Sequence, residues 1–277
     1  MTDTDLLGPV GVYGGGRMGS GIAHAFAAAG LHVTVVESDE DAATTARRRI
    51  ESALARAQAK GAVVEGSCKV VTDPRALADC RLVVEAVPEN VRVKHEVLAR
   101  VARHAPHAAV ATNTSSLSVD ELADALPDPS GLVGLHFFNP VPVSDLVEVV
   151  VGPRTAPELV RRAEQWVARL GRTAVKVLDS PGFASSRLGV LLALEAMRML
   201  EEGVATAEDI DTAMTLGYRH PVGPLRTTDL VGLDVRLAIA EHLERELGPR
   251  FAAPRVLREK VAAGELGRKS GRGFFSW

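Results

Sequence analysis

Between residues 9 and 179, short apolar runs alternate with amphipathic segments. Short runs bounded by glycine, proline or polar residues are typical of buried strands. The segments between them have helical periodicity, as in 157–171, where positions 159, 160, 163, 166, 167 and 170 are apolar. The runs predicted as strands are 9–14, 31–37, 68–72, 81–90 with its exit loop, 109–112, 132–135, 146–151 and 173–179.

A glycine motif follows the first predicted strand. Gly14, Gly16 and Gly19 have the spacing G-x-G-x-x-G and open the helix MGSGIAHAFAAAG. In dinucleotide-binding folds the first glycine permits a tight turn, the second lets a pyrophosphate approach the backbone, and the third lets helix and strand pack closely. The next strand ends in Glu37, whose carboxylate can accept from both ribose hydroxyls and would repel a 2′-phosphate. The combination predicts an NAD site.

Four further side chains bear on this site. Arg17 and Met18 lie between the second and third glycines, and we expect them to border the cofactor. Arg47 and Arg48 could in principle serve a 2′-phosphate, but they belong to the predicted helix 39–61 and are expected to face solvent. NAD is therefore favoured over NADP.

The pattern changes after the strand at 173–179. The segment SPGFASSRL is followed by helical segments without a strong strand pattern, so a domain boundary is predicted at Pro181-Gly182. Strands that alternate with helices predict a parallel sheet with helices on both faces. The fold class expected is α/β, with a Rossmann-type doubly wound sheet at 1–182 and a smaller all-helical C-terminal domain at 183–277.

The first helix of the second domain suggests an oligomer. The segment predicted as this helix, 187–202, is apolar on more than one face. Such a helix suits burial by a partner as well as by its own domain. We therefore expect a homodimer formed through the C-terminal domain.

Polar residues interrupt the apolar runs of 109–151 at three points. AVAT ends at the NTSS segment 113–116, a second run ends at His136, and LVEVVV carries Glu148 in its middle. Strand ends in an open α/β sheet are where ligands bind, and hydroxyl, imidazole and carboxylate groups together make a base with an orienting partner. Two readings stay open: a catalytic pair of His136 and Glu148, or a satisfied core histidine and an edge-strand charge.

Three motifs carry a family resemblance. NTSSLS at 113–118, GLHFFNPVP at 134–142 and LVEVV at 146–150 resemble the 3-hydroxyacyl-CoA dehydrogenase family. The resemblance implies that Ser115 contacts the substrate hydroxyl, that His136 is the catalytic base and that Glu148 orients it. The similarity covers residues 9–277 in order and is weakest at 40–80. Asn139 of HFFNP is also polar, but a turn role is the stronger expectation for it.

The resemblance extends the cofactor site as well. It places Glu89 and Lys94, which follow the strand at 81–90, against the cofactor. Asn113, which opens the NTSS segment, is assigned to the same site. The alternative for Glu89 and Lys94 is that they are ordinary solvated charges near the helix VRVKHEVLARVARH.

The chain departs from the family pattern in two places. Where the family has an asparagine that hydrogen-bonds the substrate, this chain has Ser186, which keeps one donor but has a shorter reach. The segment between Gly61 and Glu85 is shorter than in many members, in which a helical pair there holds the CoA nucleotide. Both departures concern substrate recognition rather than NAD.

Composition narrows the remaining choices. The chain of 277 residues is 46% hydrophobic, and its net charge of −3 gives no field for nucleic acid or an anionic membrane. Cys68 and Cys80 lack the CxxC spacing, so we expect neither a disulfide scaffold nor a metal site. No apolar run approaches about 18 residues, and the N-terminus has no signal-peptide pattern. We expect a cytoplasmic protein that binds neither nucleic acid nor membrane.

Three functions follow, in decreasing order of support. The first is NAD-dependent interconversion of a 3-hydroxyacyl and a 3-oxoacyl thioester, with short-chain acyl-CoA as substrate. The second keeps this hydride transfer but takes a short hydroxyacyl group on acyl carrier protein, as in secondary metabolism, because a shortened nucleotide-binding segment suits a carrier without the CoA nucleotide. The third is a non-catalytic structural protein on the same scaffold.

Overall fold

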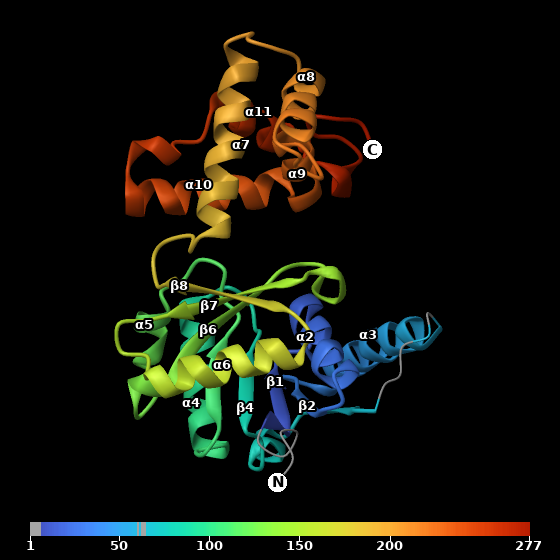
Figure 1. Cartoon of the computed structure of the whole chain (residues 1–277), viewed down its shortest axis with the longest axis vertical. Helices are drawn as coiled ribbons and strands as arrows, with labels where there is room; N and C mark the ends of the chain where they lie inside the picture. The colour runs from blue at the N-terminus through green and yellow to red at the C-terminus, as the bar shows by residue number, and fades with distance from the viewer. Residues whose placement is uncertain (1–6, 60, 62–64) are drawn as a thin grey trace. The chain divides into compact units, whose positions relative to one another are not determined.

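A sheet of eight strands forms the centre of residues 1–180 (Figure 1). The structure is a computed structural model that describes residues 7–59, 61 and 65–277. The strand order is β3-β2-β1-β4-β5-β6-β7-β8, and all neighbours are parallel except β6 and β7. The strands are β1 (Val10–Tyr13), β2 (His32–Val36), β3 (Ser67–Val71), β4 (Leu82–Glu85), β5 (Ala109–Thr112), β6 (Leu132–Phe137), β7 (Leu146–Val151) and β8 (Thr173–Leu178).

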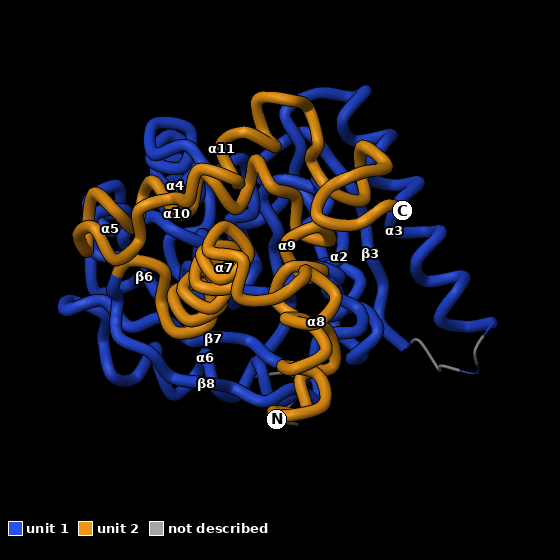
Figure 2. Tube along the Cα trace, turned by 90° about the horizontal axis from the view of Figure 1, so that it is seen from above, with its two compact units in different colours: residues 1–180 blue, residues 181–277 orange. Residues whose placement is uncertain are grey.

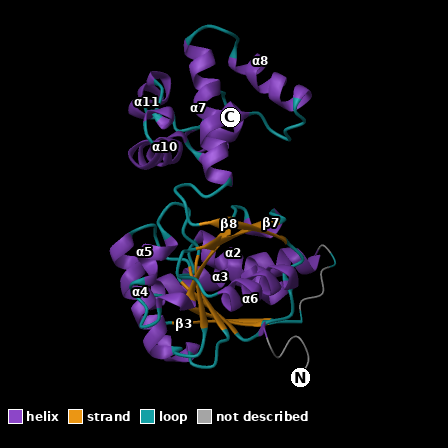
Figure 3. Cartoon of the chain, turned by 60° about the vertical axis from the view of Figure 1, so that its left-hand side comes forward, coloured by secondary structure: helices purple, strands orange, loops and turns teal. Residues whose placement is uncertain are grey.

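Helices cover both faces of the sheet, which confirms the doubly wound α/β class (Figure 3). On one face α2, α3 and α6 pack apolar side chains against alternate strand residues, and Trp166 of α6 is fully buried there. On the other face lie α4 and α5. The helices of this unit are α2 (Arg17–Ala28), α3 (Glu40–Ala59), α4 (Val91–His104), α5 (Val119–Ala123) and α6 (Pro157–Arg169), with 3₁₀ turns at Pro74–Leu77, Pro129–Gly131 and Val141–Val143.

The carboxyl ends of the parallel strands lie at the same end of the sheet. Immediately beyond β1, the Gly14 N–H donates to Val36 O, and beyond β4 the Ala86 N–H donates to Tyr13 O, both at 2.8 Å. Beyond β5 the Asn113 N–H donates to Glu85 O at 2.8 Å. The strand order reverses between β1 and β4, and this is the place where open sheets of this kind bind ligands.

Residues 181–277 form a second, helical unit with its own apolar core (Figure 2). Thr206 caps α8, because its hydroxyl accepts a hydrogen bond from the Asp209 N–H at 3.2 Å. Asp229 holds the end of the chain, since it accepts from the N–H groups of Phe274 and Phe275 at 2.9 Å. The helices are α7 (Ser185–Glu201), α8 (Ala207–Thr212), α9 (Pro224–Val231), α10 (Leu233–Leu247) and α11 (Arg255–Ala262).

Several details differ from the sequence-based expectations. The strand predicted to end before His136 continues through it to Phe137, and α7 begins at Ser185 rather than at 187. The strand β7 lies between β6 and β8, so Glu148 is not an edge-strand charge. The shortened segment after Gly61 includes 62–64, which lie outside the described residues. Over the part of the chain that is described, no helix has the length and apolar character needed to cross a bilayer.

Candidate active site

The glycine loop after β1 leaves open space beside Gly16. Gly14 has φ +93°, a conformation that favours glycine, and a Cβ on Gly19 would lie 1.7 Å from Gly14 O. By contrast, a Cβ on Gly16 would meet no atom within 4 Å. Gly16 is also the N-cap of α2 and supplies no side-chain cap. The first N–H groups of α2 are therefore available to an anionic group, and the loop fits the pyrophosphate of a dinucleotide.

Glu37 is fixed against this loop. Its Oε1 accepts a hydrogen bond from the Gly15 N–H at 2.6 Å, so the carboxylate lies at the end of β2 beside the glycines. Arg17 is exposed, and Met18 packs partly against the core. Arg47 is exposed and donates to Val70 O at 3.3 Å on β3. These positions suit NAD, because the Glu37 carboxylate is fixed beside the loop and its negative charge would repel the 2′-phosphate of NADP.

His136 and Glu148 form a buried pair across β6 and β7. The two residues are direct partners in the antiparallel register, and His136 Nδ1 lies 2.7 Å from Glu148 Oε2. His136 is 7% exposed and Glu148 is 1% exposed. A carboxylate accepts only, so Nδ1 carries the proton in this pair and the imidazole lone pair is on Nε2. The ring of Phe138 lies 4.5 Å from that of His136, centroid to centroid.

Asn113 connects the strand of the histidine to the NTSS turn. Its Oδ1 accepts a hydrogen bond from the Phe137 N–H at 3.0 Å. Phe137 follows His136 directly, and Asn113 is two residues before Ser115. This bond therefore fixes the end of β6 against the segment that carries the serine. The structure gives Asn113 this positioning contact, and its assignment to the cofactor stays a prediction.

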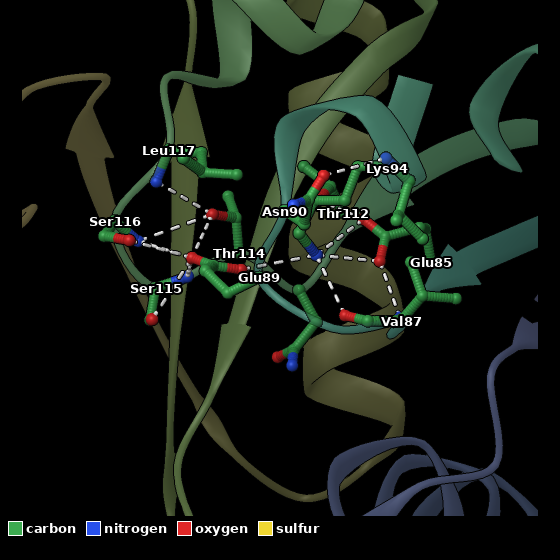
Figure 4. A network of polar contacts seen from close by, with 12 residues as sticks. Glu85, Val87, Glu89, Asn90, Lys94, Thr112, Thr114, Ser115, Ser116 and Leu117 are labelled. Carbon is green, nitrogen blue, oxygen red and sulfur yellow. Dashed lines mark hydrogen bonds and ion pairs between the residues drawn. The ribbon is translucent and has the colours of Figure 1, made fainter. Parts of the chain in front are cut away.

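Glu89 organises the turn itself (Figure 4). Its Oε1 accepts from Thr114 Oγ1 at 2.7 Å, from the Ser115 N–H at 2.8 Å and from the Ser116 N–H at 3.0 Å. The Ser115 hydroxyl lies 3.3 Å from the same oxygen. Burial by itself would raise the pKa of Glu89, but Lys94 and these hydrogen bonds outweigh burial and hold the pKa below its ordinary value.

Lys94 is fully buried, so the alternative of a solvated helix charge is wrong for it. Its ammonium group lies 2.8 and 3.0 Å from the two carboxylate oxygens of Glu85 and 3.4 Å from Glu89 Oε2. Glu85 is also fully buried and accepts from Thr112 Oγ1 at 2.7 Å. Glu85 is not among the residues predicted from the sequence, although its position at the end of the apolar run LVVE was a signal for it.

The remaining predicted residues are distributed as follows. Ser186 lies in the first turn of α7, in the second unit, and its role as a substrate contact stays a prediction. Asn139 lines a cavity of about 280 Å³ on the first unit. No group of three metal-ligating side chains is found within the described residues.

The cavity beside Asn139 is strongly cationic. Arg17 from the start of α2 and Arg49 and Arg56 from α3 line it, together with Ser20 and the 140–142 segment. Arg49 and Arg56 could not be selected from the sequence, because arginines on the polar face of an amphipathic helix are ordinary. A cavity lined by three arginines can receive phosphate groups, which arginine binds in a bidentate manner.

Comparison with known proteins gives a consistent result. Residues 9–180 match the family model described as 3-hydroxyacyl-CoA dehydrogenase, NAD binding domain, and residues 182–277 match that of the C-terminal domain. A 3-hydroxybutyryl-CoA dehydrogenase of Mycobacterium tuberculosis is 43% identical over 285 residues, covering 99% of this chain and 100% of the relative.

Two crystal structures are similar over nearly their whole length. The (S)-3-hydroxybutyryl-CoA dehydrogenase PaaH1 from Ralstonia eutropha has a TM-score of 0.91 at 36% identity, covering 97% of this chain and 98% of that one. FadB2 of M. tuberculosis has a TM-score of 0.90 at 43% identity, with coverage of 97% and 98%.

Proposed function

Because the chain belongs to the 3-hydroxyacyl-CoA dehydrogenase family and is an NAD-dependent enzyme, we propose that it interconverts 3-hydroxyacyl and 3-oxoacyl thioesters of short acyl chains carried by CoA. The reaction class rests on the buried pair of His136 and Glu148. The choice of CoA rests on the arginine-lined cavity. Membership of an enzyme family sets aside the non-catalytic reading.

His136 acts as the proton acceptor in this proposal. With the Nδ1 proton directed to Glu148, Nε2 takes the proton of the substrate hydroxyl during oxidation and returns it during reduction. The imidazolium that forms is stabilised by a carboxylate 2.7 Å away in a buried setting. The glycine loop and Glu37 would hold NAD, which would accept the hydride from C3 of the acyl chain during oxidation and return it during reduction.

Ser115 acts on the other side of the reacting oxygen. Its hydroxyl donates to the oxygen as that oxygen acquires carbonyl character, which orients the substrate toward His136. The bond between Asn113 and Phe137 supports this arrangement, because it ties the serine turn to the strand of the histidine. Ser186, from the second unit, is proposed as a further hydrogen-bond donor to the substrate.

The cavity favours CoA over acyl carrier protein. CoA presents a diphosphate and a 3′-phosphate, whereas the arm of a carrier protein presents a single phosphodiester. Three arginines lining one cavity suit the larger charge, since each Arg–phosphate contact is a charge-assisted hydrogen bond. The short segment after Gly61 still favours the alternative in which acyl carrier protein carries the substrate.

A three-substrate comparison tests the carrier. We expect wild-type enzyme to oxidise NADH with acetoacetyl-CoA at a lower KM than with acetoacetyl carrier protein or with the N-acetylcysteamine thioester, which lacks all phosphates. Arg49→Ala and Arg56→Ala should raise the KM for the CoA substrate roughly two- to tenfold and leave that for the small thioester unchanged. Arg48→Ala, an exposed neighbour outside the cavity, is the control. A lower KM for the carrier protein would overturn the CoA proposal.

We also propose a homodimer formed through the second unit. Leu188, Leu191 and Leu192 on α7 are 60%, 37% and 44% exposed, although the opposite side of the helix is buried in the core of the unit. Leu230 and Val231 of α9 and Val235 of α10 are exposed as well. An equivalent apolar face on a second copy would cover these side chains. Sedimentation equilibrium at micromolar concentration should give about twice the 29.3 kDa chain mass, and a monomer would refute the dimer.

A further inference from the structure

Glu85 is a fully buried carboxylate with all its acceptor positions engaged. Its Oε1 accepts from the Val87 N–H at 2.7 Å and from Lys94 Nζ at 2.8 Å. Its Oε2 accepts from Thr112 Oγ1 at 2.7 Å and from Lys94 Nζ at 3.0 Å. A buried ion with this many partners has one orientation, and loss of the Lys94 ammonium group would leave the Glu85 charge unpaired in the core.

Lys94 serves two carboxylates at once. Its ammonium group binds Glu85 on the buried side and reaches Glu89 Oε2 at 3.4 Å on the side of the turn (Figure 4). The third neighbour is Val87 O at 3.3 Å. Glu85 therefore fixes the position of the Lys94 ammonium group. Through its contact with Glu89 Oε2, the ammonium group limits where Oε1 of the partly exposed Glu89 can lie.

The Oε1 atom of Glu89 has more hydrogen-bond donors around it than it can bind well. Five donors surround Oε1, namely Thr114 Oγ1, the N–H and hydroxyl of Ser115, and the N–H and hydroxyl of Ser116. A carboxylate oxygen accepts about two hydrogen bonds well. The Ser115 hydroxyl has the longest of these distances, 3.3 Å, so it is the donor that leaves most readily for a substrate oxygen.

We propose that Glu85 is a positioning residue for the reaction, acting through Lys94 and Glu89 to hold the Ser115 hydroxyl in place for the substrate oxygen. Glu85 itself touches neither substrate nor cofactor in this arrangement. The buried ion pair fixes Glu89, Glu89 fixes the backbone of the 114–116 turn through two N–H groups, and the weak contact to the hydroxyl leaves it able to change acceptor. This inference rests on the proposed function, because it concerns the serine of that reaction.

A double-mutant cycle between Glu85→Gln and Ser115→Ala tests the proposal. Glutamine keeps the shape of the side chain but halves the negative charge around Lys94, so the ammonium should shift toward Glu89. We expect Glu85→Gln to lower kcat about 10- to 100-fold at saturating NADH, because misplacement of a reacting group by an ångström has effects of this size. In the Ser115→Ala background the same change should lower kcat less than twofold, since the hydroxyl that it misplaces is gone.

Two further variants complete the experiment. Glu96→Gln makes the same chemical change at an exposed position of α4 and should leave kcat unaltered. Thr112→Val removes one hydrogen bond to Glu85 but keeps the ion pair, and should lower kcat in the same direction by a smaller factor. It also substitutes in the cycle if Glu85→Gln does not fold.

The outcomes separate this inference from the proposed function. If wild-type enzyme turns over no 3-oxoacyl thioester on any carrier, the proposed function fails first. If the wild type is active and the losses caused by Glu85→Gln are equal with and without the Ser115 hydroxyl, Glu85 has a purely structural role and the inference is overturned. A loss of kcat that occurs only when the Ser115 hydroxyl is present supports the inference.

Discussion

Glu148 stands directly opposite His136 in the antiparallel register of β6 and β7, and its Oε2 lies 2.7 Å from His136 Nδ1. The pairing depends on the backbone, because the reversal of direction between β6 and β7 is what brings the two side chains to the same face at close range. Since both residues lie within strands, the backbone holds the imidazole and the carboxylate in this arrangement.

This geometry predicts different effects for the two residues. His136→Ala should lower kcat by about 10²–10⁴-fold, the usual effect of losing a general base, with NADH affinity nearly unchanged. Glu148→Gln should cost less, because an amide oxygen still accepts from Nδ1 but does not stabilise the imidazolium. Steady-state kinetics together with NADH fluorescence titration distinguish these effects. A Glu148→Gln enzyme with full activity at every pH would remove Glu148 from the mechanism.

Glu37 should determine the choice of cofactor. Its carboxylate is held at the glycine loop by the Gly15 N–H, so a 2′-phosphate at the ribose would meet a fixed negative charge. We expect NADH to bind more tightly than NADPH, and Glu37→Ala to reduce this preference. Fluorescence titration of both cofactors measures it. Equal or tighter binding of NADPH by the wild type would contradict the prediction and direct attention to Arg47 and Arg48.

His24 should make the protein less stable in mild acid. It is 7% exposed on α2, and neither ring nitrogen has a hydrogen-bond partner among the described residues. Burial, reinforced by the nearby Arg172 and Arg56, lowers the pKa of His24 below its ordinary value of 6.5. The unfolded chain therefore takes up a proton at a higher pH than the folded one, and stability falls as the pH drops below about 6.5.

Replacement of the imidazole tests this. His24→Leu should flatten the fall in unfolding free energy between pH 7 and pH 5, measured by urea titration, and should not destabilise the protein at pH 8, because an unsatisfied polar group is exchanged for an apolar one. His107→Gln, at an exposed position, should follow the wild-type curve. Parallel curves for wild type and His24→Leu would show that His24 does not carry the effect.

The sequence predicted the elements better than the contacts between them. The glycine motif and the apolar runs placed β1, α2 and β2 because local spacing determines these elements. The burial of Lys94 could also be predicted from the sequence, since positions 94, 97, 98 and 101 form one helical stripe, and three of them are apolar. Its pairing with Glu85 could not, because strand β4, the loop after it and helix α4 must first assemble.

The arginine cavity was beyond sequence reasoning for the same reason. Arg17 belongs to α2, whereas Arg49 and Arg56 belong to α3, and each alone is an ordinary exposed cation. Only the packing of α2 beside α3 gathers them at one cavity. A site can be predicted from the sequence where its residues are neighbours along the chain. A site whose residues come from different helices can be found only once the fold is known.

Ser186 offers a test of substrate recognition. The family pattern has an asparagine at this position, where the chain has a shorter side chain in the first turn of α7. Ser186→Asn should regain a hydrogen bond to a small substrate, worth about 0.5–1.5 kcal/mol, and so raise kcat/KM for acetoacetyl-CoA roughly two- to tenfold. For a bulkier or more polar short-chain 3-oxoacyl thioester the larger amide should crowd the acyl group and lower kcat/KM. Kinetics of wild type and variant on both substrates decide the matter. If asparagine improves both alike, Ser186 is a weaker form of the same contact, and its shape does not select the acyl group.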